Sequence, residues 1–394
     1  MKICDKCGYQ NQDNAVFCLK CGHMIGFGSN KTQQKNNPPR PQPQQSNQFN
    51  YPPKPQPKTN GPSPQGNSSV IDSLNNYMGN SSNAPLNWRD LFVNVFKKHS
   101  TQEAEDLFIY GTRRTTPPLY AVSSDWPKPW LYSRVLLGLV ITFFLLKLAV
   151  DVFANPNAIP GVIFIGSMAF PVAIAFLFME INVFRNISFY KIALVFLIGG
   201  AASLLSTLLL YAFMLPDMQE LGYLEALLVG IIEETGKFLI IFFFIKKLPN
   251  CNYILNGLLI GALVGAGFAA FESAGYAFGC LLEDDLGAMY GNIYLRGFLS
   301  PGGHVAWSAI VGAAIILGRD PNQTPLTVGT ILSNNRFWRI VIIPVLLHFL
   351  WDCPLMPNLI KFIILLVVAW VITLILIQMG LQEVNALTNR PQKP

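Results

Sequence analysis

Eight apolar stretches of about twenty residues follow one another from residue 133 to residue 379. A helix of about twenty apolar residues crosses the hydrocarbon core of a bilayer, and its backbone polar groups then pair within the helix itself. Hydrophobic residues make up 51% of the chain and charged residues only 13%, which argues against a soluble globule. We therefore predict an all-α polytopic membrane protein. The predicted spans are residues 133–153, 159–181, 190–214, 223–245, 254–281, 301–318, 338–353 and 358–379.

The connections between these spans alternate in charge. Basic residues precede the first span and mark the second, fourth and sixth connections, whereas the connections between those are acidic or neutral. Positive charge in short loops marks the cytoplasmic side. Both termini of this multi-pass protein of the cell membrane are therefore expected in the cytoplasm. The net charge of +6 follows the same distribution, so we expect the lipid bilayer, and no nucleic acid, as its partner.

Four cysteines near the N-terminus form two Cys-x-x-Cys pairs, Cys4 with Cys7 and Cys18 with Cys21. Two such pairs are typical of a tetrahedral zinc site, and a closed shell of four thiolates leaves no position for water. Residues 1–25 are therefore predicted to form a zinc ribbon whose metal is structural. We expect the ribbon to bind a protein partner.

The remaining organisation follows from composition. Residues 26–85 are rich in Pro, Gln and Asn, which predicts a disordered tether. Residues 86–130 carry an apolar stripe at helical spacing and predict one or two amphipathic helices near the membrane surface. The transmembrane domain is assigned to residues 131–380, and residues 381–394 form a cytoplasmic tail.

Ionisable residues interrupt four neighbouring spans of this domain. A charged side chain near the bilayer centre costs at least about 2.5–3.5 kcal/mol. Several such groups in adjacent spans are best explained by one buried site in which they satisfy one another. The candidate catalytic residues are Glu233, Glu234, Lys237, Glu272, His304, His348 and Asp352.

Their spacing and depth agree with a single site. Lys237 lies four residues after Glu233, and Asp352 four residues after His348, so each pair shares one helix face. A rise of about 1.5 Å per residue places all of these groups in the outer half of the bilayer. Glycines before Glu272, and Gly275 and Gly279 after it, are expected to let helices approach closely.

This set of side chains fits hydrolysis. Two adjacent carboxylates in a low dielectric cannot both ionise cheaply, which produces a general base from Glu233 or Glu234. The histidines would stabilise the oxyanion or protonate the amine. Alternatively, His304, His348 and Glu272 could hold a catalytic zinc ion, and the sequence leaves this choice open.

Together these residues resemble the PrsW family of intramembrane proteases, within a wider group that includes CAAX prenyl endopeptidases and bacteriocin-immunity-type proteins. The matches follow the family's order across about residues 130–380, and they are Glu233-Glu234-x-x-Lys237, Phe268-x-x-x-Glu272, His304 in GGHVAW and His348-x-x-Trp351-Asp352. The resemblance implies an endopeptidase that cuts a single-span membrane protein of the anti-sigma-factor type. It also implies that the paired glutamates activate water and the histidines complete the site.

Two other function classes remain open. Intramembrane acids and histidines also mark the ion pathways of transporters, so a proton- or ion-coupled transporter is an alternative. A non-catalytic membrane scaffold, whose ribbon binds partners, is another. A cleavage assay separates both from a protease.

Overall fold

The computed structural model describes residues 2–3, 10–11, 70–80, 86–214, 222–319, 326–355 and 359–389. The chain divides into two units, residues 1–51 and residues 52–394. In the first unit, strands β1 (Lys2–Ile3) and β2 (Gln10–Asn11) pair antiparallel, with Ile3 opposite Gln10. The four cysteines predicted to bind zinc lie outside the described residues.

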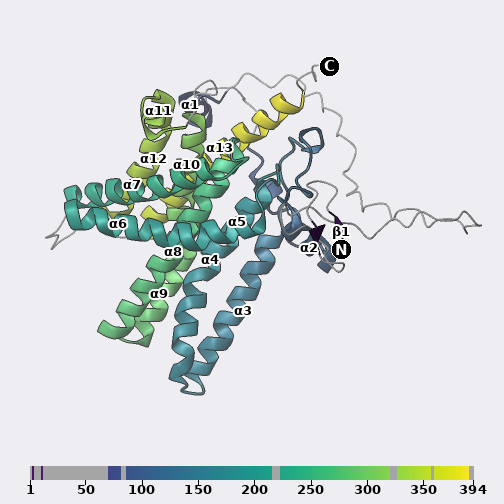
Figure 1. Ribbon diagram of the computed structural model, residues 1–394. Helices are drawn as coiled ribbons and strands as arrows, with labels where there is room; N and C mark the ends of the chain where they lie inside the picture. Colours follow the sequence, from purple (N-terminus) through teal and green to yellow (C-terminus); the bar gives the residue numbers. More distant parts are fainter. Residues whose placement is uncertain are drawn as a thin grey trace, which may run out of the picture. The chain divides into compact units, whose positions relative to one another are not determined.

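The described part of the second unit consists of helices and their connections (Figure 1). The first helices are α1 (Val70–Met78), η1 (Trp88–Leu91), α2 (Thr101–Ile109), η2 (Leu119–Ala121), α3 (Leu131–Asp151), η3 (Pro156–Ala158), α4 (Ile159–Ile181), α5 (Phe189–Leu194), the π-helical turn η4 (Val195–Gly199) and α6 (Gly200–Met214). The chain continues through α7 (Tyr223–Lys247), α8 (Ile254–Glu283), α9 (Leu286–Leu299), η5 (Ser300–Gly302), α10 (His304–Leu317), α11 (Val328–Leu332), α12 (Asn335–Asp352) and α13 (Leu359–Thr388).

Among the described residues, six helical stretches are long and apolar enough to cross a membrane. They are residues 131–151, 156–181, 189–214, 254–283, 286–317 and 359–388. Two more of the predicted spans correspond to α7 and α12, which are helices of 25 and 18 residues. Both carry more charged residues than an ordinary span, and in α7 these include Glu233, Glu234 and Lys237. The polytopic all-α prediction is therefore confirmed.

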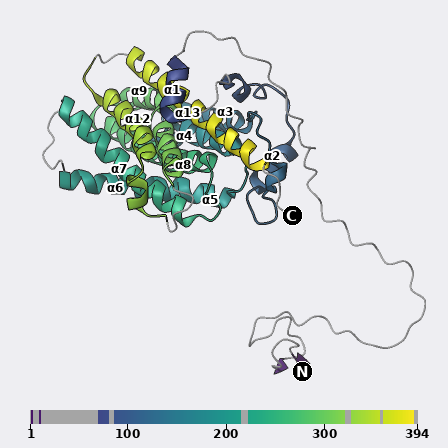
Figure 2. The same cartoon turned by 90° about the horizontal axis from the view of Figure 1, so that it is seen from above.

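Helix α8 forms the centre of the membrane domain. Of its most apolar stretch, 94% is buried, whereas only 11% is buried in α3, which lies against α4 at the edge (Figures 1 and 2). Helices α4, α6 and α10 all pack on α8. This central position explains why α8 is rich in small residues, since neighbouring backbones must approach it from several sides.

Two segments differ from the sequence predictions. Residues 70–78 fall within the predicted tether but form α1, because Leu74 and Met78 recur at helical spacing and Met78 is buried against the core cluster. The connection after the fifth predicted span is largely α9 rather than a loop. Asp285 caps this helix by accepting a hydrogen bond from the backbone N–H of Ala288 at 2.8 Å.

Long-range hydrogen bonds gather several helix ends at one end of the domain. Arg319, after α10, donates to Asn252, before α8, at 2.6 Å. Glu383 in α13 accepts from the backbone N–H of Ile254 at 2.8 Å. The start of α12 lies there as well, since Arg336 lines one pocket together with Asn252, Arg319 and Glu383. His304 and Asp352, at the opposite ends of α10 and α12, therefore lie toward the other end of the domain.

Candidate active site

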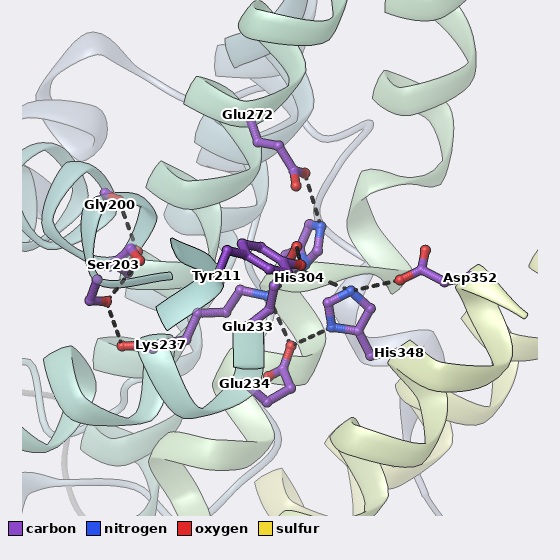
Figure 3. A network of polar contacts seen from close by, with 12 residues as sticks. Gly200, Ser203, Tyr211, Glu233, Glu234, Lys237, Glu272, His304, His348 and Asp352 are labelled. Atoms are coloured by element: carbon purple, nitrogen blue, oxygen red, sulfur yellow. Dashed lines mark hydrogen bonds and ion pairs between the residues drawn. The ribbon is translucent and has the colours of Figure 1, made fainter. Parts of the chain in front are cut away.

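Helices α7, α8, α10 and α12 bring the candidate residues into one polar cluster (Figure 3). Helix α7 contributes two adjacent carboxylates and a lysine, α8 a carboxylate, α10 a histidine, and α12 a histidine with a carboxylate one turn later. All seven side chains proposed from the sequence are members: Glu233, Glu234, Lys237, Glu272, His304, His348 and Asp352. The structure thus brings together groups that lie up to 119 positions apart in the chain.

Lys237 joins the two glutamates of its own helix to α10. Its side chain is fully buried, with Nζ 3.2 Å from Glu233 Oε2 and 2.8 Å from Glu234 Oε1. The same ammonium lies 2.8 Å from His304 Nδ1 and 4.3 Å from the centre of the Phe268 ring. A buried lysine needs acceptors for its three protons, and these contacts supply them.

His304 is the first residue of α10, directly after Gly303. Because the Lys237 ammonium can only donate, Nδ1 of His304 must accept. The proton of a neutral imidazole then lies on Nε2, which is 3.1 Å from Glu272 Oε2. Lys237 and Glu272 thus fix the tautomer and the orientation of this ring.

His348 lies between carboxylates on both sides. Its Nδ1 is 3.0 Å from Glu234 Oε1, and its Nε2 is 3.3 Å from Asp352 Oδ2 and 3.6 Å from Glu233 Oε2. The Trp307 ring packs against the imidazole with 4.7 Å between ring centres. The imidazole is therefore held both by ion pairs and by packing.

Close contact between α8 and α10 sets the distance between Glu272 and His304. A Cβ added at Gly261 would lie 2.0 Å from the backbone oxygen of Ser308, and one at Gly265 would lie 2.3 Å from that of His304. These glycines act as the sequence predicted. Gly275 and Gly279 do not, since neither has a neighbouring atom within 4 Å of an added Cβ. This half of α8 extends beyond the close helix contact.

Two residues of the site were not foreseen. The Tyr211 hydroxyl of α6 donates to Glu233 Oε1 at 3.1 Å, and Arg296 of α9 pairs with Glu272 and donates to Ser273 Oγ at 2.9 Å. Nothing in the sequence assigned Tyr211 to the site, because tyrosines are common near the ends of membrane spans. Arg296 was an isolated cation in an acidic connection, and that isolation was the signal available for it.

Three side chains of the cluster suit a metal ion. Ligand atoms from Glu233, His304 and His348 all lie within 4.8 Å of one another. Two imidazoles and one carboxylate form a donor set found at hydrolytic zinc. The sequence analysis grouped Glu272 with the histidines as a possible metal ligand. In the structure, Glu272 instead contacts Nε2 of His304 and the guanidinium of Arg296.

Two further observations bear on whether a metal fits. Glu234 Oε2 is buried and has no hydrogen-bond partner within the described part of the chain, so the site lacks a donor there. Among the described residues, four carboxylates also face only Lys237 and Arg296 as permanent cations, a deficit that a divalent ion would balance. Lys237 competes with such an ion, however, because the single lone pair of His304 Nδ1 cannot serve both.

Residues 188–377 match the family model of the PrsW family intramembrane metalloprotease. These residues are PrsW-like. They contain every member of the polar cluster in Figure 3. The match and the six candidate spans together indicate a PrsW-like peptidase in a multi-pass membrane protein.

A curated relative agrees with this assignment. The protein named Protease PrsW from Halalkalibacterium halodurans is 27% identical over 164 residues, which cover 41% of this chain and 68% of that protein. Residues 3–25 separately match a zinc-ribbon domain, as the two cysteine pairs predicted. No solved structure matches the chain. The zinc-ribbon match indicates zinc, and the metalloprotease match indicates a metal.

Proposed function

We propose that this PrsW-type protein hydrolyses a peptide bond of a single-span membrane protein, near the extracytoplasmic side of the cell membrane. The observation that carries the proposal is the convergence of Glu233, His304 and His348 within 4.8 Å inside a helical membrane domain. An anti-sigma-factor type of protein is the proposed substrate class, because the sequence resembles a family that cuts such proteins.

The orientation rests on charge. The domain end where Arg319 contacts Asn252 also holds Arg336, while Lys246 and Lys247 lie at the C-terminal end of α7. Clustered basic residues favour the cytoplasmic side. Both termini are accordingly proposed to be cytoplasmic, which keeps the ribbon cysteines in a reducing compartment. His304 and Asp352 then lie toward the extracytoplasmic side.

Glu233, His304 and His348 are proposed to hold a zinc ion, which would polarise the scissile carbonyl and activate water. Glu234 is proposed as the general base, because its Oε2 is the oxygen without a partner while Oε1 is anchored by Lys237 and His348. Its proton is passed to the leaving amine as the C–N bond breaks.

The remaining members position these groups. Glu272 orients His304 at Nε2, and Glu234 Oε1 orients His348 at Nδ1, as carboxylates commonly do for imidazole ligands. His348 Nε2, beside Glu233 and Asp352, is then the nitrogen left for the ion, and Asp352 adds a carboxylate next to it. Lys237, once released from His304 Nδ1, is left as a donor for the oxyanion of the tetrahedral intermediate. Tyr211 holds the second oxygen of Glu233.

The N-terminal ribbon is proposed to bind a structural zinc ion through Cys4, Cys7, Cys18 and Cys21. Four thiolates close its coordination shell, so this ion would take no part in hydrolysis. We propose that the ribbon recruits a protein partner.

Co-expression with tagged single-span proteins tests the proposal. We expect cleavage by the native chain, and its loss in Glu233→Gln, Glu234→Gln and His348→Ala. Glu225→Gln is the matched control, since it makes the same change two turns earlier on α7. A membrane-permeant chelator should also stop cleavage. Cleavage that survives the chelator would contradict the metal assignment, and cleavage that survives Glu234→Gln would contradict the base.

A further inference from the structure

A cleft lies next to His304, which lines it, whereas Lys237 and Glu233 do not. Its volume is ≈ 130 Å³, and it is bounded by α8, α9, α10, α12 and the start of α13. The lining residues that matter here are Ala269, Leu295, Leu299, Trp307, Trp351 and Phe362. Because His304 also lines the cleft, a group bound there would lie directly beside the proposed reaction centre.

The walls of the cleft are mainly aromatic and aliphatic. The Trp351 ring lies 5.5 Å from that of Trp307 and 4.5 Å from that of Phe362, measured between ring centres. Leu295 and Leu299 complete the apolar wall from α9. A cavity of about 150 Å³ lined by apolar residues binds benzene in another protein. The present cleft is therefore of the size that one leucine or phenylalanine side chain fills.

Two buried polar groups on the same walls have no partner among the described residues. They are the indole N–H of Trp307 and the hydroxyl of Ser300. Trp307 is fully buried, so its unpaired donor costs about 1–3 kcal/mol unless a ligand supplies an acceptor. A peptide carries a carbonyl oxygen next to every side chain. An extended peptide segment therefore offers both an apolar side chain to fill the cleft and a carbonyl oxygen to accept a hydrogen bond.

We propose that this cleft is the specificity subsite of the enzyme and takes a large apolar side chain, leucine, methionine or phenylalanine, from a residue flanking the cut bond. Both polar atoms are buried in the cleft wall, and a small shift of that wall on binding lets the adjacent peptide carbonyl accept from Trp307 or Ser300. The inference rests on the proposed proteolytic function, which it deepens by naming the substrate sequence class. Filling an apolar pocket discriminates by about 10- to 100-fold in kcat/KM against a residue that leaves it empty.

The test uses the purified full chain in proteoliposomes and a single-span reporter. The extracytoplasmic juxtamembrane segment of the reporter is randomised, and the cut sites are read by mass spectrometry. We expect leucine, methionine or phenylalanine to be enriched at least about tenfold over alanine and glycine at one flanking position. Cutting without such a preference would overturn the subsite while leaving the protease intact. A complete lack of cutting would instead overturn the proposed function, and the subsite with it.

Two variants of cleft residues test whether the cleft determines this side-chain preference. Ala269→Leu fills the cleft and should shift the preference toward alanine or glycine, whereas Phe362→Ala enlarges it and should admit tryptophan. Ile363→Ala is the control, because this neighbour of Phe362 is 42% exposed and does not line the cleft. An unchanged preference in Phe362→Ala, in protein that still cuts, would overturn the assignment even if Ala269→Leu failed to fold.

Discussion

Lys237→Met removes the ammonium that lies between Glu233, Glu234 and His304. Methionine is similar in length and apolar, so the change leaves little empty space and acts mainly on charge. Breaking a buried ion pair by removing one partner costs about 3–5 kcal/mol, because the remaining charge stays buried. Here both carboxylates lose the same cation, at 3.2 and 2.8 Å. We expect the unfolding equilibrium constant to rise by roughly two to four orders of magnitude.

The chain supplies a matched control for this prediction. Lys147 and Asp151 on α3 form an ion pair with the same spacing of four residues, but their side chains are 24% and 38% exposed. Asp151 is the last residue of α3, so this partly exposed pair lies at the membrane boundary within reach of water, and Lys147→Met should change stability far less than Lys237→Met. Reversible unfolding in detergent micelles, followed by circular dichroism, measures both variants. Equal losses of stability would refute the argument that burial makes the Lys237 pairs important.

Three further predictions concern two helices near the site and the connection before α8. Arg296→Gln removes the cation beside Glu272, and we expect initial cleavage rates to fall at least about tenfold, with part of the loss recovered by Arg296→Lys. Gly261→Ala forces α8 and α10 apart and should destabilise the fold by about 1–3 kcal/mol, whereas Gly275→Ala, with open space around it, should be neutral or slightly stabilising in the same unfolding assay. Burial raises the pKa of the Cys251 thiol to about 12, so only about one thiol in ten thousand is ionised at pH 8. Maleimide labelling, mapped by mass spectrometry, should then modify the partly exposed Cys280 and leave Cys251 unmodified. Rapid labelling of Cys251 would contradict its buried position.

The sequence supported the membrane fold because long apolar helices are a local property, visible in any window of twenty residues. It also supported the choice of polar residues, since lipid excludes isolated charges such as Glu233 and Lys237. Partner identity could not be predicted in the same way. The contact of Lys237 with His304 joins residues 67 positions apart, and it depends on how α7 and α10 are rotated about their axes.

The contacts of Arg296 and Tyr211 could not be predicted from local sequence patterns. Arg296 lies on α9, which contains tyrosines, an asparagine and glycines among its apolar residues. This mixed composition predicts a loop rather than a span. Its pairing with Glu272 depends on α9 folding back along α8. Tyr211 reaches Glu233 because α6 packs on α7, which no periodicity in either helix encodes.

The position of the cut in a single-span substrate tests the central claim most directly. The purified chain would be reconstituted in proteoliposomes with the substrate, and the released fragments identified by mass spectrometry. The cluster of α7, α8, α10 and α12 predicts a cut within about two helical turns of the extracytoplasmic boundary, lost in Glu233→Gln and retained in Glu225→Gln. A cut at the cytoplasmic boundary, or one that persists in Glu233→Gln, would contradict the account.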